Sequence, residues 1–216
     1  MIISKGMRVT IRSMPLAGMT QPTVAAVMIF GGDDTLYGDA GDDTIEGNTG
    51  DDNLFGGLGA DNIAGGGGLD VLNGGAGNDT LSSDRLDSSA DFSRGVGETL
   101  IGAEGEDTII FSNADQVSGG ADTDTFHYVY RDVTSHPVVI TDFEKDIDTL
   151  TVHYSPQTDG QGNPIVPAMS LEIDASIGET LIKLDGVVVA KLQGDITISS
   201  SDVTLAEYDA TFLDRL

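Results

Sequence analysis

Regularly spaced aspartates are the residues of this chain whose chemistry is easiest to interpret. Six of them recur at intervals of nine residues, and each stands two positions before a leucine or isoleucine: Asp34, Asp43, Asp52, Asp61, Asp70 and Asp79. A carboxylate is a hard oxygen ligand, and hard cations such as calcium prefer such ligands. From Ser13 to Asp84 the sequence contains no lysine, arginine or histidine that could neutralise these acids. The pattern therefore predicts a row of cation sites.

Glycines divide the same region into units of nine residues. Five consecutive units have glycine at the first and fourth positions and aspartate at the sixth: GDAGDDTIE, GNTGDDNLF, GGLGADNIA, GGGGLDVLN and GGAGNDTLS, after a partial unit GGDDTLY. Glycine supplies the positive φ that turns need, and one apolar residue in each unit points inward. Such a unit forms a strand of about three residues, which is stable only when units stack on one another. Successive units should alternate between two sheets, so that two units form one coil of 18 residues.

Stacked coils place residues of equal position above one another at roughly 4.8 Å, the spacing of strands in a sheet. The inward residues form two ladders, one of Leu36, Leu54 and Leu72 and one of Ile45, Ile63 and Leu81. The aspartates line the two edges of the coils, where they repel one another unless a cation lies between them. Glycine turns leave backbone carbonyls accessible as further calcium ligands. The predicted fold is all-β, with two parallel sheets around a thin aliphatic core and calcium along the turns.

These units resemble the hemolysin-type, or RTX, calcium-binding repeat, G-G-x-G-x-D-x-(Leu/Ile)-x, over residues 31 to 82. The resemblance implies a right-handed parallel β-roll that holds several calcium ions between its turns. It implies side-chain ligands from the six aspartates and from Asp39 and Asn48 at the second position. It also implies carbonyl ligands from the turn glycines Gly32, Gly41, Gly50, Gly59, Gly68 and Gly77. Later units have glycine at the second position, so we expect only carbonyls to coordinate there.

A polar stretch around residues 83–92 interrupts the register, which then resumes in a degraded form. Acids again precede an apolar residue by two positions, in steps of nine, eight and nine residues, at Glu98, Asp107, Asp115 and Asp124. We expect further coils with one deletion, and one or two further calcium sites at Asp107 and Asp124.

The composition changes after Tyr128, where glycine becomes rarer and alternating runs of β-branched and aromatic residues predict strands. The segment VVITDFEKDIDTLTV resembles the one that closes the roll in secreted RTX proteins such as the serralysins. Lys145 replaces a glycine common in that family and one residue is missing, which leaves the roles of Asp142, Asp146 and Asp148 open. Farther on, the dipeptide at 185–186 is Asp-Gly and predicts a type I′ hairpin turn.

We expect three segments. Residues 1–29 would form an N-terminal capping segment, which we favour over a cleaved signal peptide; residues 30–127 the calcium roll; and residues 128–216 a C-terminal antiparallel β cap with a secretion signal. The final ATFLDRL is similar to the end of type I secretion substrates of the RTX family, which carry an uncleaved export signal. The resemblance implies export by the bacterial type I secretion machinery and an extracellular or cell-surface location.

The charge balance argues against several classes of partner. Acids outnumber bases 36 to 10, for a formal net charge of -26, so nucleic acid and anionic lipid would be repelled. The sequence has no apolar run of about 20 residues to span a membrane, and no cysteine for disulfides or thiolate sites. The motifs H-E-x-x-H and G-x-S-x-G are absent, and three histidines are scattered over the C-terminal half. We therefore expect no enzyme activity.

These observations predict a secreted, non-enzymatic calcium-binding protein that folds on calcium binding after export. Without calcium, acidic turns and short strands cannot offset the chain entropy. Two alternatives remain open: a calcium-dependent, self-assembling subunit of a surface layer, biofilm matrix or adhesion structure, and a non-catalytic fragment or partner of an RTX enzyme. Self-association would increase light scattering when calcium is added, whereas a monomeric module would only become more compact.

Overall fold

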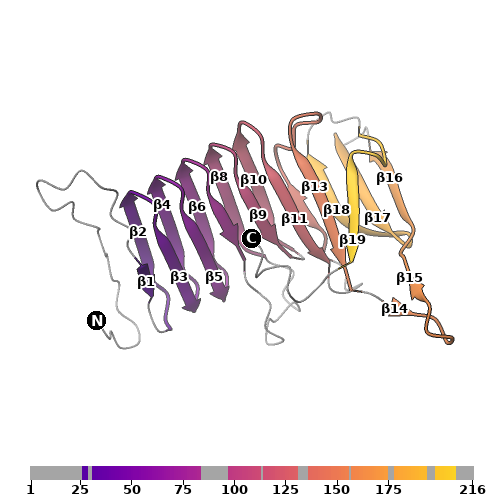
Figure 1. Ribbon diagram of the computed structural model, residues 1–216, viewed down its shortest axis with the longest axis horizontal. Coiled ribbons are helices and arrows are strands. Elements are labelled where there is room, and N and C mark those ends of the chain that lie inside the picture. Colours follow the sequence, from indigo (N-terminus) through magenta and orange to yellow (C-terminus); the bar gives the residue numbers. More distant parts are fainter. Residues whose placement is uncertain are drawn as a thin grey trace, which may run out of the picture.

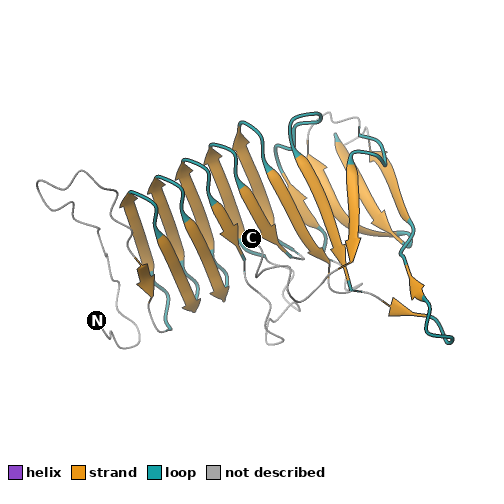
Figure 2. Ribbon diagram, in the orientation of Figure 1, coloured by secondary structure: helices purple, strands orange, loops and turns teal. Residues whose placement is uncertain are grey.

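The computed structural model describes residues 26–28, 31–83, 97–112, 114–130, 136–155, 157–174, 178–193 and 198–207. In these ranges every regular element is a strand, and nearly all strands belong to two long sheets that run along the molecule (Figures 1 and 2). No helix in the described ranges is long and apolar enough to cross a membrane. The predicted all-β class is confirmed.

Consecutive strands from β1 to β13 alternate between the two sheets, and strands within a sheet are parallel over this range. The eight-stranded sheet has the order β1 (Ala26–Met28), β3 (Thr44–Thr49), β5 (Asn62–Gly67), β7 (Thr80–Ser82), β9 (Thr108–Phe111), β11 (Thr125–Tyr130), β13 (Thr149–Tyr154) and β19 (Val203–Glu207). The nine-stranded sheet has the order β16 (Met169–Asp174), β17 (Glu179–Leu184), β18 (Val187–Gln193), β12 (Val138–Ile140), β10 (Gln116–Ala121), β8 (Thr99–Glu104), β6 (Val71–Ala76), β4 (Asn53–Leu58) and β2 (Thr35–Ala40). A short hairpin of β14 (Gln157–Thr158) and β15 (Pro164–Ile165) is separate from both sheets. This alternation is the parallel β-roll that the repeats predict.

The register of the repeats agrees with the prediction. Leu36 pairs with Leu54 and Leu54 with Leu72 in one sheet. In the other sheet Ile45 pairs with Ile63, and Ile63 with Leu81. These six side chains are at most 1% exposed, so each coil buries one aliphatic side chain from each sheet.

The strands of the repeats are longer than the three residues predicted. β2 to β6 each contain six residues, because pairing continues past the inward residue into the first three positions of the next unit. The first-position glycine makes this possible. A Cβ at Gly38 would lie 2.5 Å from both Asp43 Oδ2 and the carbonyl oxygen of Gly56, so only glycine fits between them.

The register resumes after the interruption, as the spacing of the acids predicts. β6 pairs with β8 through Leu72 and Leu100, and β7 pairs with β9 through Leu81 and Ile109. Residues 84–96 lie outside the described part of the chain. On the far side of this interruption, β8 and β9 take the places in the two sheets that the alternation predicts.

Both sheets continue beyond residue 128. Phe126 pairs with Leu150, and Leu150 with Val203. The nine-stranded sheet gains an antiparallel end, in which β18 pairs in parallel with β12 and antiparallel with β17. The β17–β18 turn has positive φ at Asp185 (50°) and Gly186 (84°), as the predicted type I′ turn requires.

The division into three segments stays a prediction, and β11 spans the position where the second segment would end. The segments proposed as N-terminal cap and export signal fall largely on residues 1–25 and 208–216, outside the described residues.

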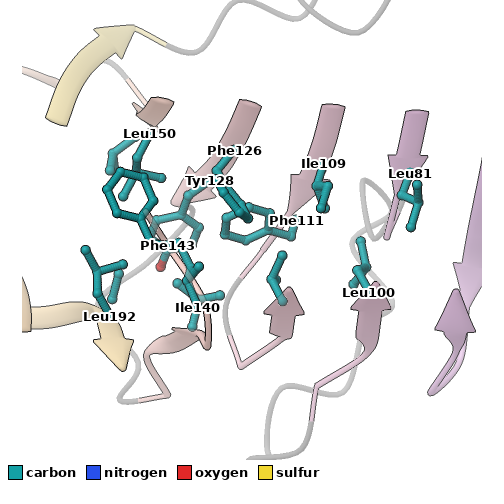
Figure 3. Packing of buried hydrophobic residues seen from close by; sticks show 14 of the residues in the cluster. Leu81, Leu100, Ile109, Phe111, Phe126, Tyr128, Ile140, Phe143, Leu150 and Leu192 are labelled. Atoms are coloured by element: carbon teal, nitrogen blue, oxygen red, sulfur yellow. The ribbon is translucent and has the colours of Figure 1, made fainter. Parts of the chain in front are cut away.

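The core changes along the roll. It is aliphatic in the repeats, as predicted, whereas from β9 onward it contains Phe111, Phe126, Tyr128 and Phe143 (Figure 3). The rings of Phe111 and Tyr128 stack at 5.8 Å, and those of Phe111 and Phe126 meet edge to face at 6.2 Å. Larger side chains thus fill the space between the sheets in the C-terminal coils.

Candidate metal centre

The sixth-position aspartates form a buried ladder along each edge of the roll. Each lies in the turn just before a strand and is at most 2% exposed. One oxygen, Oδ1, accepts the backbone N–H of the acid one coil earlier. The pairs are Asp34 N to Asp52 (2.8 Å), Asp43 N to Asp61 (2.7 Å), Asp52 N to Asp70 (2.8 Å), Asp61 N to Asp79 (2.8 Å), Asp79 N to Asp107 (2.8 Å) and Asp107 N to Asp124 (3.0 Å).

The second carboxylate oxygen lacks such a donor at several rungs. Within the described part of the chain, Oδ2 is buried and has no hydrogen-bond partner in Asp34, Asp52, Asp61, Asp79 and Asp107. A buried carboxylate oxygen without a partner is costly unless a cation or a proton compensates it. The repeated orphan oxygen therefore fits a bound hard cation.

Burial dominates the electrostatics of these carboxyl groups. Burial, together with repulsion from neighbouring acids of the ladder, raises the pKa of Asp52 and of Asp79 to about 6 and that of Asp107 to about 7. Burial also raises the pKa of Asp124 to about 6, with added repulsion from Asp148. Without a cation, ionisation of these groups near neutral pH works against the fold.

Side chains alone do not complete a metal site. Over the described residues, no group of three or more His, Cys, Asp or Glu side chains lies close enough to hold a metal ion. A cation in the turns would therefore need further oxygens besides these side chains, and backbone carbonyls are among those that calcium readily accepts.

The fourth-position glycines bring backbone carbonyls of successive turns close together. Gly59 has φ of 128°, and a Cβ there would lie 2.3 Å from the carbonyl oxygen of Gly41. The same approach recurs along the turns, at Gly50 over Gly32, Gly68 over Gly50 and Gly77 over Gly59. These are the glycines that the repeat pattern implies as carbonyl ligands, and that role stays a prediction.

The second-position residues occupy the left-handed region, with φ of 70° at Asp39 and 71° at Asn48. Asp39 is exposed, and the Asn48 side-chain amide donates to the carbonyl of Glu46 at 3.5 Å. Their predicted ligand role is untested by these contacts.

Asp148 and Asp115 end the two ladders, a role that the repeat pattern did not assign. Asp148 accepts the N–H groups of Asp124 at Oδ1 (3.0 Å) and of Glu144 at Oδ2 (2.7 Å). Asp115 likewise accepts two backbone N–H groups, one at each oxygen and both at 2.9 Å. Protein amides thus engage both oxygens at these rungs. The sequence held a signal for Asp148, which stands two positions before the buried Leu150.

Asp142 contacts residues of β10. Its carboxylate accepts the hydroxyl of Ser118 at 2.5 Å and the N–H groups of Gly119 and Gly120 at 3.0 Å each. Asp146 lies in a turn with φ of 68°. Of the three acids left open by the sequence, two therefore bind backbone amides of the preceding coil.

Two histidines that are distant in sequence lie side by side on β11 and β13. Nδ1 of His127 is 3.1 Å from Nε2 of His153. Burial, followed by repulsion from His153, lowers the pKa of His127 to about 4, and burial also lowers the pKa of His153. Both rings are therefore neutral at pH 7.

A family comparison agrees with the repeat pattern of the sequence. The family described as RTX calcium-binding nonapeptide repeat (4 copies) matches residues 29–63 and 55–87. No curated protein matches the chain. Among solved structures, the chain is similar to the solution structure of the AlgE6R3 subunit from the Azotobacter vinelandii mannuronan C5-epimerase, with 22% identity over 80% of this chain and 82% of that chain and a TM-score of 0.38. Between residues 29 and 87, in the coils that end at β7, the chain carries RTX calcium-binding nonapeptide repeats.

Proposed function

We propose that this protein is a secreted, non-catalytic calcium-binding module whose β-roll folds when calcium enters its turns. The observation that supports the proposal is the buried carboxylate oxygen without a hydrogen-bond partner, which recurs at Asp34, Asp52, Asp61, Asp79 and Asp107. A divalent cation next to each oxygen would replace an unfavourable buried charge by an ion pair within hydrogen-bonded turns.

The proposed ligands combine side chains and backbone. The sixth-position carboxylates, with Asp107 and Asp124 in the later coils, supply charged oxygens, and the fourth-position glycines supply carbonyls. Asp39 and Asn48 add side-chain oxygens in the first coils. Asp115 and Asp148 differ, because backbone amides already engage both of their oxygens.

The energetic effect is large enough to control folding. A site that is tenfold above its Kd stabilises the fold by about 1.4 kcal/mol. Extracellular calcium modules bind with a Kd of roughly 10⁻⁴ to 10⁻³ M. About four to six sites with a Kd near 10⁻⁴ M would together supply about 5 to 8 kcal/mol in millimolar calcium, comparable to the whole stability of a typical domain. Export from a calcium-poor cytosol by the type I machinery would therefore couple release to folding.

A calcium titration of the purified, EGTA-treated full chain tests the proposal. We expect a cooperative gain of β-structure by circular dichroism and binding of several ions by calorimetry, with calcium but not with magnesium. A chain that is fully folded in EGTA at pH 7 and binds no calcium would contradict the proposal. Light scattering in the same titration tests the alternative of self-assembly, which predicts particle growth that increases with protein concentration.

A further inference from the structure

Asn73 is the one asparagine of this chain that a glycine follows. In such a pair, the backbone nitrogen of the glycine can attack the side-chain carbonyl carbon of the asparagine. Glycine favours this reaction, because it has no side chain to block the approach and leaves the backbone free to bend. The pair Asn73–Gly74 is therefore the place in the sequence where the unfolded chain deamidates most readily.

The reaction consumes only the chain and water. The nitrogen of Gly74 loses its proton and bonds to Cγ of Asn73. The bond from Cγ to the side-chain nitrogen breaks, ammonia leaves, and a five-membered imide remains. Water then opens the ring at one of its two carbonyls. One opening gives aspartate, and the other gives isoaspartate, whose main chain runs through the side-chain carbon and is one atom longer.

The folded roll holds the pair in a geometry that opposes this attack. Both residues lie inside β6, which pairs with β4 on one side and with β8 on the other (Figure 1). Asn73 pairs with Phe55 and Ile101, and the pairing continues on both sides at Gly75. Neither Asn73 nor Gly74 has a positive φ. In a paired strand the side chain points out of the sheet, whereas the next N–H group lies in the sheet and donates to a neighbouring strand, so the reacting atoms are kept apart.

The coil has no room for the longer main chain of isoaspartate. A Cβ at Gly74 would lie 2.2 Å from Asp79 Oδ2. A Cβ at Gly75 would lie 2.2 Å from the carbonyl oxygen of Gly57. On the other side of the pair, Leu72 is fully buried in the inward ladder. An extra backbone atom between Leu72 and Gly75 must therefore displace one of these close contacts, whereas the aspartate product keeps the normal main chain.

We propose that Asn73–Gly74 is a deamidation site that is closed in the folded roll and open in the unfolded chain. Deamidation there makes a reversible loss of structure permanent, because the isoaspartate product cannot rebuild the packing around β6. The opening of the site on withdrawal of calcium is the part of this inference that rests on the proposed function. A chain kept without calcium then loses, with time, its ability to fold when calcium returns.

Ageing of the purified full chain tests the site. The chain is incubated at pH 7 in calcium, in EGTA, and in EGTA with urea, and peptide mass spectrometry follows the conversion of each asparagine. We expect Asn73 to react at least about ten-fold more slowly in calcium than in urea, because the reaction requires opening of β6. Asn53 in β4 and Asn62 in β5 are internal controls. Leucine and isoleucine follow them, so both should react more slowly than Asn73 in urea.

Two variants separate the extra backbone atom from the added charge. Asn73→Gln forms a six-membered ring only slowly, so after ageing in urea it should refold fully when urea is removed and calcium is added. The pair Asp185–Gly186 is unchanged in this variant, which therefore also controls for isomerisation elsewhere. Freshly prepared Asn73→Asp has the charge without the longer main chain and should also refold. The aged unmodified chain should lose refolding, measured by circular dichroism, in proportion to its isoaspartate at position 73.

The result for this site can be distinguished from the result for the proposed function. If the chain stays folded in EGTA, the calcium function fails, and the closed site then predicts that Asn73 is as protected in EGTA as in calcium and reacts only in urea. Equal reaction of Asn73 in the folded chain and in urea would overturn the closed site. Full refolding of chains that contain isoaspartate at position 73 would overturn the permanent loss of structure.

Discussion

Replacing Asp52 by asparagine should change the stability of the protein in opposite directions with and without calcium. Asp52 is 1% exposed, and its Oδ1 accepts the N–H of Asp34 at 2.8 Å. Its Oδ2 has no hydrogen-bond partner in the described structure. Asparagine can keep the first interaction, but it removes the negative charge and the proposed calcium ligand.

The pKa of Asp52 gives the size of the effect in the metal-free protein. Burial, with repulsion from Asp34 and other neighbouring acids, raises this pKa from 3.8 to about 6. The folded state binds the proton of Asp52 more tightly than the unfolded state does. The contribution of Asp52 to stability is therefore fully present below pH 3.8 and is lost as the pH rises through 6. This difference corresponds to about 3 kcal/mol, and residual hydration reduces it. We expect metal-free Asp52→Asn to be about 1 to 3 kcal/mol more stable at pH 7.

In the presence of calcium, Asp52→Asn should instead lower the stability of the protein. Loss of one site removes about 1.4 kcal/mol when calcium is tenfold above its Kd. Urea unfolding followed by circular dichroism, in EGTA and in calcium at pH 7, measures both effects, and a third series at pH 4 in EGTA should show little gain. Asp51→Asn is the control, because it removes the same charge at an exposed neighbour and can keep the bond to Leu69 N. If the two variants respond alike in both conditions, the reasoning about the buried oxygen is wrong.

Three further predictions concern other parts of the roll. Ala103 has φ of 91°, so Ala103→Gly should stabilise the calcium-bound protein by about 1 kcal/mol in urea unfolding. The control is Ala76→Gly, at a position without positive φ, which should destabilise the protein by up to about 1 kcal/mol. Leu54 is fully buried, so Leu54→Ala should cost about 2 to 5 kcal/mol and raise the calcium midpoint of folding in circular dichroism; an unchanged midpoint would argue against one cooperative core. The pKa of His127 is lowered to about 4, so its contribution to stability is present above pH 6.5 and is lost as pH falls towards 4. His127→Gln should therefore flatten the fall in the urea midpoint of the calcium-bound protein between pH 7 and 4, and an equal slope in both proteins would contradict this.

Much of the fold could be predicted because the repeat is local and periodic. The spacing of an acid two positions before an apolar residue located the inward ladders and the return of the register at Leu100 and Ile109. The Asp-Gly pair likewise predicted the β17–β18 turn. Each of these signals depends on residues close together in the sequence.

The features that were missed depend on contacts between different coils. The hydrogen bond that Asp51 accepts requires the N–H of Leu69, one coil away. The contact between His127 and His153 requires β11 and β13 to be neighbours. The six-residue strands follow from close packing around first-position glycines such as Gly38, which single units do not reveal.

Each hydrogen bond of the buried ladder joins acids in neighbouring coils, whatever the number of residues between them. These bonds join acids 18 residues apart in the repeats, 28 apart across the interruption, 17 apart in the next coil and 24 apart at the end, yet all are 2.7 to 3.0 Å long. The number of residues between two bonded acids can thus change while the bond is kept, and the entropy of closing a longer loop grows only slowly with its length. Asp79 and Asp107, on either side of the interruption, are joined by a bond as short as those within the regular repeats. In the described coils, the register of the ladder is therefore set by the stacking of the coils and not by the number of residues between them.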